Sequence, residues 1–279
     1  MPLVSPREIL LPAYEAGRLI GAFNTGNLEM TMGILRAAEE HGAPILLQIA
    51  EKRLPHSPLA LMGPLMAEAA RKAKIPVAVQ LDHGESENVI EAALNYGFTG
   101  IMFDGSSLPL EENIQRTSQV KAQLSTVNCQ LSTVWVEGEI GVLSGSEGGP
   151  EAEALHSDPA EAQRFAEESG CDALAVSIGN AHGRYKGRPK LNFAILEEIR
   201  RRTSLPLVLH GGSGIPEEDL RRAVGLGICK VNIATARFEA LHRGAEPIAA
   251  DYFALSEAMV KSVYESTKAH LEMFERVSV

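Results

Sequence analysis

The sequence predicts a (β/α)8 barrel with a helical extension at its C-terminus, and three observations lead to this fold. Short runs rich in Val, Ile, Leu and Ala alternate with longer amphipathic segments along the chain. Strands this apolar, each separated from the next by a helix, indicate parallel βαβ units with both sheet faces covered. Eight such units in 279 residues suit a closed barrel. An open, doubly wound sheet is the alternative, because periodicity alone does not show closure.

The individual elements follow from these runs. The apolar runs predict strands at residues 20–24, 44–50, 76–82, 100–104, 132–137, 173–179, 206–210 and 228–233. The amphipathic segments predict helices at residues 30–41, 59–73, 87–96, 111–124, 159–169, 193–202 and 217–226. We expect residues 237–279 to supply the last barrel helix and the extension, with a break near residues 244–247. Since no linker or shift in composition interrupts the pattern, we expect one domain over residues 1–279.

Charge and composition argue against several classes of partner. The formal net charge is −10 and the isoelectric point is about 5.4, so neither nucleic acid nor an anionic membrane surface is expected as the main partner. No run reaches the roughly 18 to 20 apolar residues of a membrane span, and the first residues lack the apolar core of a signal peptide. The three cysteines form no CxxC pair, which favours reduced thiols in a cytoplasmic protein.

Three of the eight histidines directly follow predicted strands, and these are His83, His182 and His210. The carboxyl ends of barrel strands meet at one mouth, where the active sites of such barrels form. A lone histidine is more often structural than a ligand, but three that converge on one mouth reverse this expectation. Three imidazoles with an open fourth position are the donor set of a catalytic zinc site. We therefore predict a metal at this mouth.

Carboxylates occupy neighbouring positions. Asp82 precedes His83 and could be a general acid/base, an acceptor for a metal-bound histidine, or a cap of the next helix. Asp104 and Glu139 could ligate a second metal or hold the ligands of the first one in place. Glu147 falls in a Gly-rich stretch, residues 138–150, where it could act as an acid/base above the mouth or be a solvated surface acid.

Two loops favour a phosphate site. Residues 210–214, with the sequence HGGSG, follow the seventh predicted strand, and residues 232–235 end the eighth. Glycines let consecutive N–H groups approach an anion, and barrels frequently bind phosphate after strands seven and eight. An ordinary strand-to-helix connection is the alternative. The basic run at residues 183–190 is either a solvated surface or a positively charged lid beside this site.

Several of these segments carry a family resemblance, and they are GAFN (21–24), LDHG (81–84), FDGS (103–106), VEGEIG (136–141), AHG (181–183) with YKG (185–187), HGGSG (210–214) and KVNIAT (230–235). In this order and spacing they resemble the class II, metal-dependent ketose-bisphosphate aldolases, the fructose- and tagatose-bisphosphate aldolase family. The resemblance covers about the first 240 residues. It implies an enzyme that reversibly cleaves a phosphorylated ketose, similar to fructose or tagatose 1,6-bisphosphate, into dihydroxyacetone phosphate and an aldehyde.

The resemblance also implies roles for single residues. His83, His182 and His210 would bind catalytic Zn²⁺, while Asp104 and Glu139 would serve a second divalent position. Asp82 would donate a proton to the aldehyde oxygen, and Glu147 would remove the C3 proton of dihydroxyacetone phosphate. Substrate contacts would come from Asn24, Gly183, Gly211, Gly212, Ser213, Asn232, Ile233, Ala234 and Thr235. A monovalent cation, Na⁺ or K⁺, near Gly183 and Ser213 and a homodimer or homotetramer are further implications.

The chemistry is consistent with these roles, because a zinc ion can stabilise the charge of the enediolate that retro-aldol cleavage leaves. Three alternatives stay open. A Schiff-base aldolase would use Lys230 as its nucleophile. A metal-dependent hydrolase on the same barrel would use zinc-bound hydroxide. A catalytically idle relative would serve as a chaperone or as the activator of another subunit.

Overall fold

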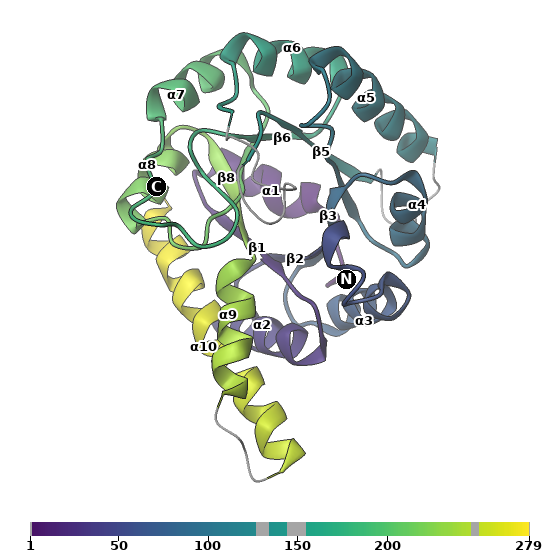
Figure 1. Cartoon of the computed structure of the whole chain (residues 1–279), viewed down its shortest axis with the longest axis vertical. Helices are drawn as coiled ribbons and strands as arrows, with labels where there is room; N and C mark the ends of the chain where they lie inside the picture. Colours follow the sequence, from purple (N-terminus) through teal and green to yellow (C-terminus); the bar gives the residue numbers. More distant parts are fainter. Residues whose placement is uncertain (1, 127–133, 144–154, 247–250, 279) are drawn as a thin grey trace.

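A closed barrel of eight parallel strands forms the centre of the molecule (Figure 1). The computed structural model describes residues 2–126, 134–143, 155–246 and 251–278. The strands pair in sequence order, and β8 closes the barrel by pairing with β1. They are β1 (Ile20–Asn24), β2 (Ile45–Ala50), β3 (Val77–Gly84), β4 (Gly100–Phe103), β5 (Trp135–Ile140), β6 (Ala173–Val176), β7 (Leu207–Leu209) and β8 (Ile228–Ile233). The closure excludes the open doubly wound sheet.

Helices alternate with the strands and lie around the barrel, except for the first, which crosses its N-terminal end (Figure 1). They are α1 (Pro6–Glu15), α2 (Leu28–His41), α3 (Leu59–Lys72), α4 (Glu87–Asn95), α5 (Leu110–Thr126), α6 (Pro159–Ser169), α7 (Phe193–Arg202), α8 (Glu217–Gly225), α9 (Thr235–Ala245) and α10 (Tyr252–Val277), with a short 3₁₀ turn, η1 (Glu51–Arg53), after β2. Capping residues and prolines determine where several of the helices begin. Asp158, for example, caps α6 by accepting hydrogen bonds from the N–H groups of Ala160 and Glu161, ahead of a proline in the first turn.

Three predicted boundaries were wrong in ways that bear on function. Strand β3 continues to Gly84, so His83 lies inside the strand rather than after it. Strand β5 extends to Ile140, which places Glu139 within the barrel wall. Strand β6 ends at Val176, so His182 lies on a loop six residues beyond the strand. Helix α1 was missed altogether, although Ser5 and Glu8 form a capping box at its start.

The barrel interior changes from apolar to polar along its axis. At the N-terminal end, inward-facing Ala22, Leu46, Ala78 and Trp135 pack with Leu10 of α1, which crosses this end of the barrel (Figure 1). Two residues further along each strand the buried side chains are polar, namely Asn24, Gln48, Gln80 and Glu137. Since side chains of a strand alternate between its faces, residues i and i+2 point the same way. The polar layer therefore lies inside the carboxyl half of the barrel.

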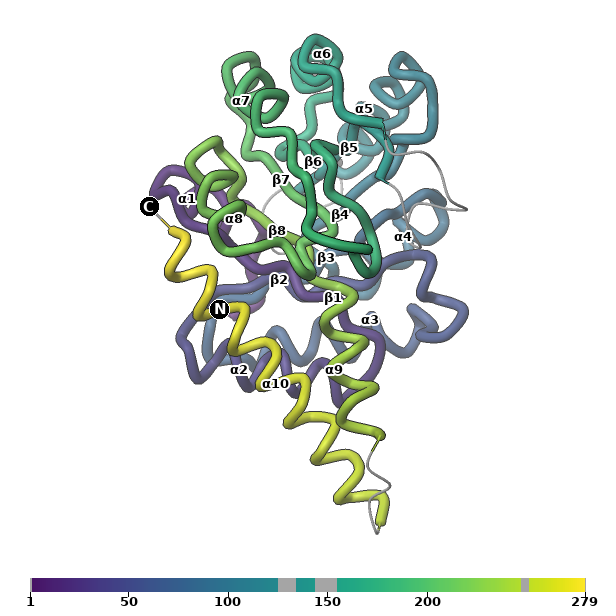
Figure 2. Tube along the Cα trace, turned by 60° about the vertical axis from the view of Figure 1, so that its left-hand side comes forward, coloured from purple at the N-terminus to yellow at the C-terminus, as the bar shows by residue number. Residues whose placement is uncertain are grey.

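Helices α9 and α10 form a hairpin that projects from one side of the barrel, as Figures 1 and 2 both show. Helix α10 returns along α2, and Val263, Leu271 and Phe274 on it join the main core. Arg237 of α9 is fully buried between the hairpin helices and bonds Ser266 and Thr267 of α10. The break predicted near residues 244–247 is close to the end of α9. Across the described residues, no helix has the length and apolar character to cross a membrane.

Candidate metal centre

A β-bulge at Asp82 and His83 brings both side chains to the mouth of the barrel. Leu81 pairs with Ile101 and Gly84 pairs with Phe103, so β3 has one residue more than β4 between these two pairs. His83 has a φ of 46°, in the left-handed region that side-chain-bearing residues seldom adopt. In a regular strand two neighbouring residues point to opposite faces, and a bulge re-aims one of them. This uncommon backbone conformation supports a functional role for the position.

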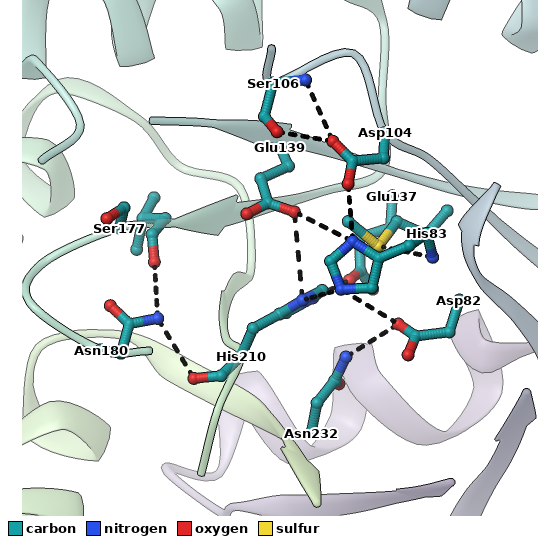
Figure 3. Close-up of polar contacts among 12 residues, drawn as sticks. Asp82, His83, Asp104, Ser106, Glu137, Glu139, Ser177, Asn180, His210 and Asn232 are labelled. Carbon is teal, nitrogen blue, oxygen red and sulfur yellow. Dashed lines mark hydrogen bonds and ion pairs between the residues drawn. The ribbon is translucent and has the colours of Figure 1, made fainter. Parts of the chain in front are cut away.

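The three predicted histidines meet at this mouth and are all buried. The rings of His83 and His182 are 4.9 Å apart between centroids, and those of His83 and His210 are 4.7 Å apart. His83 Nε2 and His210 Nδ1 face each other at 3.0 Å (Figure 3). One ring nitrogen from each of the three histidines can be chosen so that all lie within 4.8 Å of one another. Residues far apart in the sequence thus provide a three-nitrogen donor set.

Two carboxylates fix the orientation of two of these rings. Asp104 Oδ2 lies 2.6 Å from His83 Nδ1, and Ser106 in turn holds Asp104 through its N–H and hydroxyl (Figure 3). Glu137 Oε1 lies 3.0 Å from His210 Nε2. A carboxylate bound to one ring nitrogen keeps the proton there and leaves the other nitrogen as a donor to a metal. His83 Nε2 and His210 Nδ1, the two nitrogens that face each other, are therefore placed to act as donors to a metal.

Glu137 belongs to a buried charge network that the sequence did not reveal. Its Oε2 accepts from Lys230 Nζ at 2.7 Å and from Gln80 Nε2 at 3.1 Å. Burial raises the pKa of Glu137, but Lys230 and His210 outweigh it and hold the pKa at about 2. A Schiff-base lysine must present a free amine to the substrate. Lys230 is 0 % exposed and ion-paired instead, which argues against the Schiff-base alternative.

Asp82 is held by two amides rather than by the helix that follows it. Asn24 Nδ2 donates to Asp82 Oδ2 at 2.8 Å, and Asn232 Nδ2 donates to Asp82 Oδ1 at 3.0 Å. Asp82 Oδ1 is 4.0 Å from His83 Nε2, beyond hydrogen-bond distance. The predicted alternative of a helix cap was wrong, because Glu51 accepts from the N–H groups of Glu85 and Ser86 at the start of α4.

Glu139 adds a second donor group beside the histidines. Its Oε2 lies 3.7 Å from His83 Nδ1 and has no hydrogen-bond partner within the described part of the chain, although the side chain is buried. Burial, followed by the nearby Asp104 charge, raises the pKa of Glu139 well above its ordinary value. His83, Asp104 and Glu139 together form a second group whose donor atoms lie within 4.8 Å of one another. A cation bound here could satisfy the buried Glu139 oxygen.

The donor atoms fit a zinc ion. Zinc prefers nitrogen and oxygen donors in a tetrahedral arrangement, and a catalytic site keeps one position open. The second contacts on His83 and His210 are the carboxylate contacts usual for metal-bound histidines. Burial lowers the pKa of both His182 and His210, which favours the neutral imidazole that a metal requires. Asp82, Asp104 and Glu139 act oppositely on His83 and raise its pKa well above the ordinary value despite burial.

Next to the histidines lies a small pocket formed by three loops. It has an empty volume of about 210 Å³ and is lined by His182, Gly183, Gly211, Ser213, Asn232, Ala234 and Thr235. Gly211 has a φ of 63°, and a Cβ atom there would lie 2.1 Å from the carbonyl oxygen of Ala181, so only glycine fits. Ser213 Oγ accepts from the N–H of Ala236 in the first turn of α9. The pocket combines a helix start with glycine backbone, a combination suited to an anion.

Some predicted site residues lie elsewhere. Gly212 and Ile233 do not line the pocket; the N–H of Gly212 bonds the carbonyl of Asn232, and Ile233 is buried in the core. Glu147 lies outside the described residues, so its predicted role is not tested. In the basic run, Arg184 pairs with Glu239 and Arg188 pairs with Glu218 and Asp219. These ion pairs agree with a solvated surface better than with a charged lid.

Sequence reasoning missed the residues that support the site. Glu137 was recognised as a polar residue at a strand end but given no role, and the role considered for Lys230 was that of a nucleophile. Gln80, Asn180 and Tyr185 were given no role, yet all three hold atoms at the mouth. A usable signal existed for Lys230 and Glu137, because a charged residue inside an otherwise apolar strand has to be paired when it is buried.

The closed barrel carries a cluster of possible metal donors and a pocket suited to an anion at its carboxyl mouth. This is the arrangement of a metal-dependent (β/α)8-barrel enzyme. The model of the class II fructose-bisphosphate aldolases matches residues 4–278, and the chain belongs to this family. Members are aldehyde-lyases that act on phosphorylated sugars and are generally zinc-dependent. This finding confirms the predicted fold, activity and family.

Individual relatives agree with this membership. The chain is 42% identical over 241 residues to the probable fructose-bisphosphate aldolase of Bacillus subtilis, covering 84% of this chain and 82% of the relative. It is 40% identical over 241 residues to the fructose-bisphosphate aldolase of Staphylococcus aureus, with the same coverage. Among solved structures, the YdjI aldolase of Escherichia coli K12 superimposes with a TM-score of 0.87 at 32% identity, covering 98% of this chain and 97% of that chain.

Proposed function

We propose that His83, His182 and His210 hold a catalytic zinc ion with which this chain cleaves a ketose bisphosphate, or forms one from dihydroxyacetone phosphate and an aldehyde. The observation that carries the proposal is the meeting of three ring nitrogens within 4.8 Å, with Asp104 and Glu137 bound to the far nitrogens of His83 and His210. A structural histidine does not need other imidazoles beside it. Three converging imidazoles, two of them bound to carboxylates, are the arrangement of a metal site.

The residues around this centre have different roles in the proposed reaction. A bound zinc ion supplies Lewis-acid stabilisation of the charge that develops on the three-carbon fragment. Asp82, fixed by Asn24 and Asn232, gives a proton to the aldehyde oxygen in condensation and takes it back in cleavage. Removal of the C3 proton of dihydroxyacetone phosphate is assigned to Glu147 by family resemblance alone, since Glu147 lies outside the described residues.

The pocket beside His182 is the proposed place of the phosphate of dihydroxyacetone phosphate. Gly183, Gly211, Ser213 and Thr235 line it and offer backbone N–H groups and hydroxyls. Because the pocket adjoins a metal ligand, a phosphate held there would bring the carbonyl end of the same three-carbon molecule to the histidines. Binding energy from this remote group would fix the geometry of the reacting carbons.

The direct test is a condensation assay with dihydroxyacetone phosphate and a panel of aldehydes, with the stereochemistry of each product determined. The proposal predicts a new carbon–carbon bond with at least one phosphorylated aldehyde, and the product identifies the ketose. Hydrolysis of an ester or amide without any carbon–carbon product would instead support the metal-dependent hydrolase. Absence of turnover by the purified chain would support the catalytically idle relative.

Further properties belong to the same proposal. Asp104 and Glu139, with His83, are the proposed ligands of a second divalent position. A monovalent cation near Gly183 and Ser213, a homodimer or homotetramer, and a cytoplasmic location remain predictions from the family resemblance. We also propose that residues 1–279 fold as one domain, which is supported by the packing of α10 against α2 and of α1 against the barrel interior.

A further inference from the structure

The loops that follow β6 and β7 are joined by one hydroxyl group, that of Tyr185. Tyr185 Oη accepts a hydrogen bond from the N–H of Ala181 at 3.0 Å and donates one to the carbonyl of Gly211 at 2.9 Å. Ala181 directly precedes His182, and Gly211 directly follows His210. A phenol is both a donor and an acceptor, so a single group can satisfy both backbone atoms.

The backbones of the two loops are in close contact, which restricts how far the loops can move relative to each other. A Cβ atom on Gly211 would lie 2.1 Å from the carbonyl oxygen of Ala181, which means that the two backbones are already in contact. The ring of Tyr185 also packs toward Gly214, where a Cβ atom would lie 3.5 Å from Cδ2 of the ring. Tyr185 therefore belongs to the first loop by sequence, bonds the second loop through its hydroxyl, and has its ring near Gly214.

The same two loops both line the small pocket. Gly183 comes from the loop after β6, and Gly211 and Ser213 come from the loop after β7. An anion held by backbone N–H groups needs those groups at a set separation, because glycine backbone that is free to move loses the advantage of preorganisation. The separation of these walls is fixed next to the pocket by Tyr185.

We propose that Tyr185 is a positioning residue for substrate phosphate, which it serves by holding the Gly183 and Gly211 walls of the pocket at their working distance. The inference rests on the proposed function in one respect, the assignment of the pocket to phosphate. Tyr185 is not a lining residue of the pocket, so its effect on phosphate is transmitted through Ala181 and Gly211.

The metal ligands are held by other contacts, which separates the two effects. Asp104 and Glu137 orient His83 and His210, and Asn180 Nδ2 donates to the carbonyl of His210 at 3.1 Å (Figure 3). None of these bonds involves Tyr185. Loss of its hydroxyl should therefore weaken phosphate binding while zinc binding stays as it is.

The test compares Tyr185→Phe with Tyr14→Phe and the unchanged protein, all loaded with zinc. Tyr14 is a matched control, because its hydroxyl also donates to a backbone carbonyl, that of Ser204, and it lies on α1 at the opposite end of the barrel. Zinc content, affinity for inorganic phosphate by titration calorimetry, and KM and kcat with dihydroxyacetone phosphate are measured for each.

In Tyr185→Phe, we expect the dissociation constant of inorganic phosphate and the KM of dihydroxyacetone phosphate to rise roughly tenfold, since two backbone groups lose their partner. We expect kcat to change by less than about threefold, and zinc content and Tyr14→Phe to match the unchanged protein. Unchanged phosphate affinity, or an equal loss of zinc and phosphate, would overturn the inference. A chain whose phosphate affinity falls in Tyr185→Phe but that makes no aldol product would overturn the proposed function and leave this inference standing.

Discussion

At the scale of single residues, the site depends on a strained strand end. The bulge at Asp82 and His83 and the φ of 46° at His83 bring the proposed proton donor and the proposed metal ligand, which are adjacent in sequence, to the same mouth of the barrel. Asp82 then bonds Asn24 and Asn232, while His83 bonds Asp104. The separate partners mean that the two neighbours have separable functions, and this can be tested one side chain at a time.

Replacement of Asp82 should separate carbon–carbon chemistry from metal binding. In Asp82→Ala we expect cleavage and condensation to fall by roughly 10² to 10⁴, the range for loss of a general acid/base. Zinc content should remain normal, because Asp82 Oδ1 lies 4.0 Å from His83 Nε2 and forms no hydrogen bond with it. Exchange of the C3 proton of dihydroxyacetone phosphate with solvent should also continue. Loss of zinc in this variant would show that Asp82 supports the metal instead.

Replacement of Glu137 should have the opposite outcome. In Glu137→Gln we expect zinc affinity, measured by competition with a chelating dye, to fall 10- to 100-fold, because His210 loses its carboxylate and Lys230 its counter-charge. Glu111→Gln is the control, since Glu111 pairs with Arg164 on the surface. A zinc affinity equal to that of the control would contradict the role of Glu137.

At the scale of elements, the alternation of strands and helices could be predicted from the sequence, and the ends of several strands could not. Strand β5 carries Glu137 and Glu139, and their polarity made the strand look as if it ended early. Both side chains point into the barrel, where Lys230 pairs with Glu137 and His83 lies 3.7 Å from Glu139, a tertiary effect that no local pattern records. The bulge in β3 is equally hidden, because it depends on the register with β4.

Composition predicted the helical character of the hairpin formed by α9 and α10 but not the contact that anchors it, and helix α1 was not predicted at all. The hairpin was expected as a helical region, whereas its anchor, the buried Arg237, was not singled out. Burial lowers the pKa of this arginine to about 9. Arg237 Nη2 lies 3.0 Å from His270 Nδ1 of α10, and burial together with the charge of Arg237 lowers the pKa of His270 to about 4. The junction therefore contains a partly buried histidine that is neutral at pH 7.

This junction should make stability fall in mild acid. An unfolded histidine binds a proton below about pH 6.5, whereas folded His270 does so only near pH 4, so the unfolded state is favoured as pH falls between these values. From pH 7 to pH 5 this amounts to about 2 kcal/mol in the free energy of unfolding. Urea unfolding of His270→Gln should show a shallower decrease over this range. His242→Gln, on α9, is the control; an identical slope in all three proteins would refute the assignment.

At the scale of the whole molecule, the barrel explains how separated residues form one site. Eight parallel strands place their carboxyl ends at a single mouth, so the approximate position of His83, His182 and His210 was predictable from the strand pattern. The supporting contacts of Glu137, Lys230, Asn180 and Tyr185 were not, because each depends on loop geometry or on the inward face of a distant strand. The histidines that could act as metal donors were predictable from the sequence, whereas the side chains that orient them could be identified only from the structure.

Family membership fixes the reaction class, and the residue contacts assign the parts of the reaction to parts of the barrel. Strand β3 and the loops after β6 and β7 provide the proposed metal donors, while the loops after β6, β7 and β8 line the proposed phosphate pocket. His182 contributes to both groups, so the proposed metal and phosphate sites share a wall. A single three-carbon substrate could therefore contact both at once.

The most direct measurement is a zinc titration of the metal-free protein with cleavage activity followed at each step. If His83, His182 and His210 hold the catalytic ion, activity is absent without metal, rises in proportion to added zinc, and reaches most of its maximum at one zinc per chain. A His210→Ala variant should remain inactive at the same zinc concentrations. Full cleavage activity in protein shown to contain no metal would contradict the account.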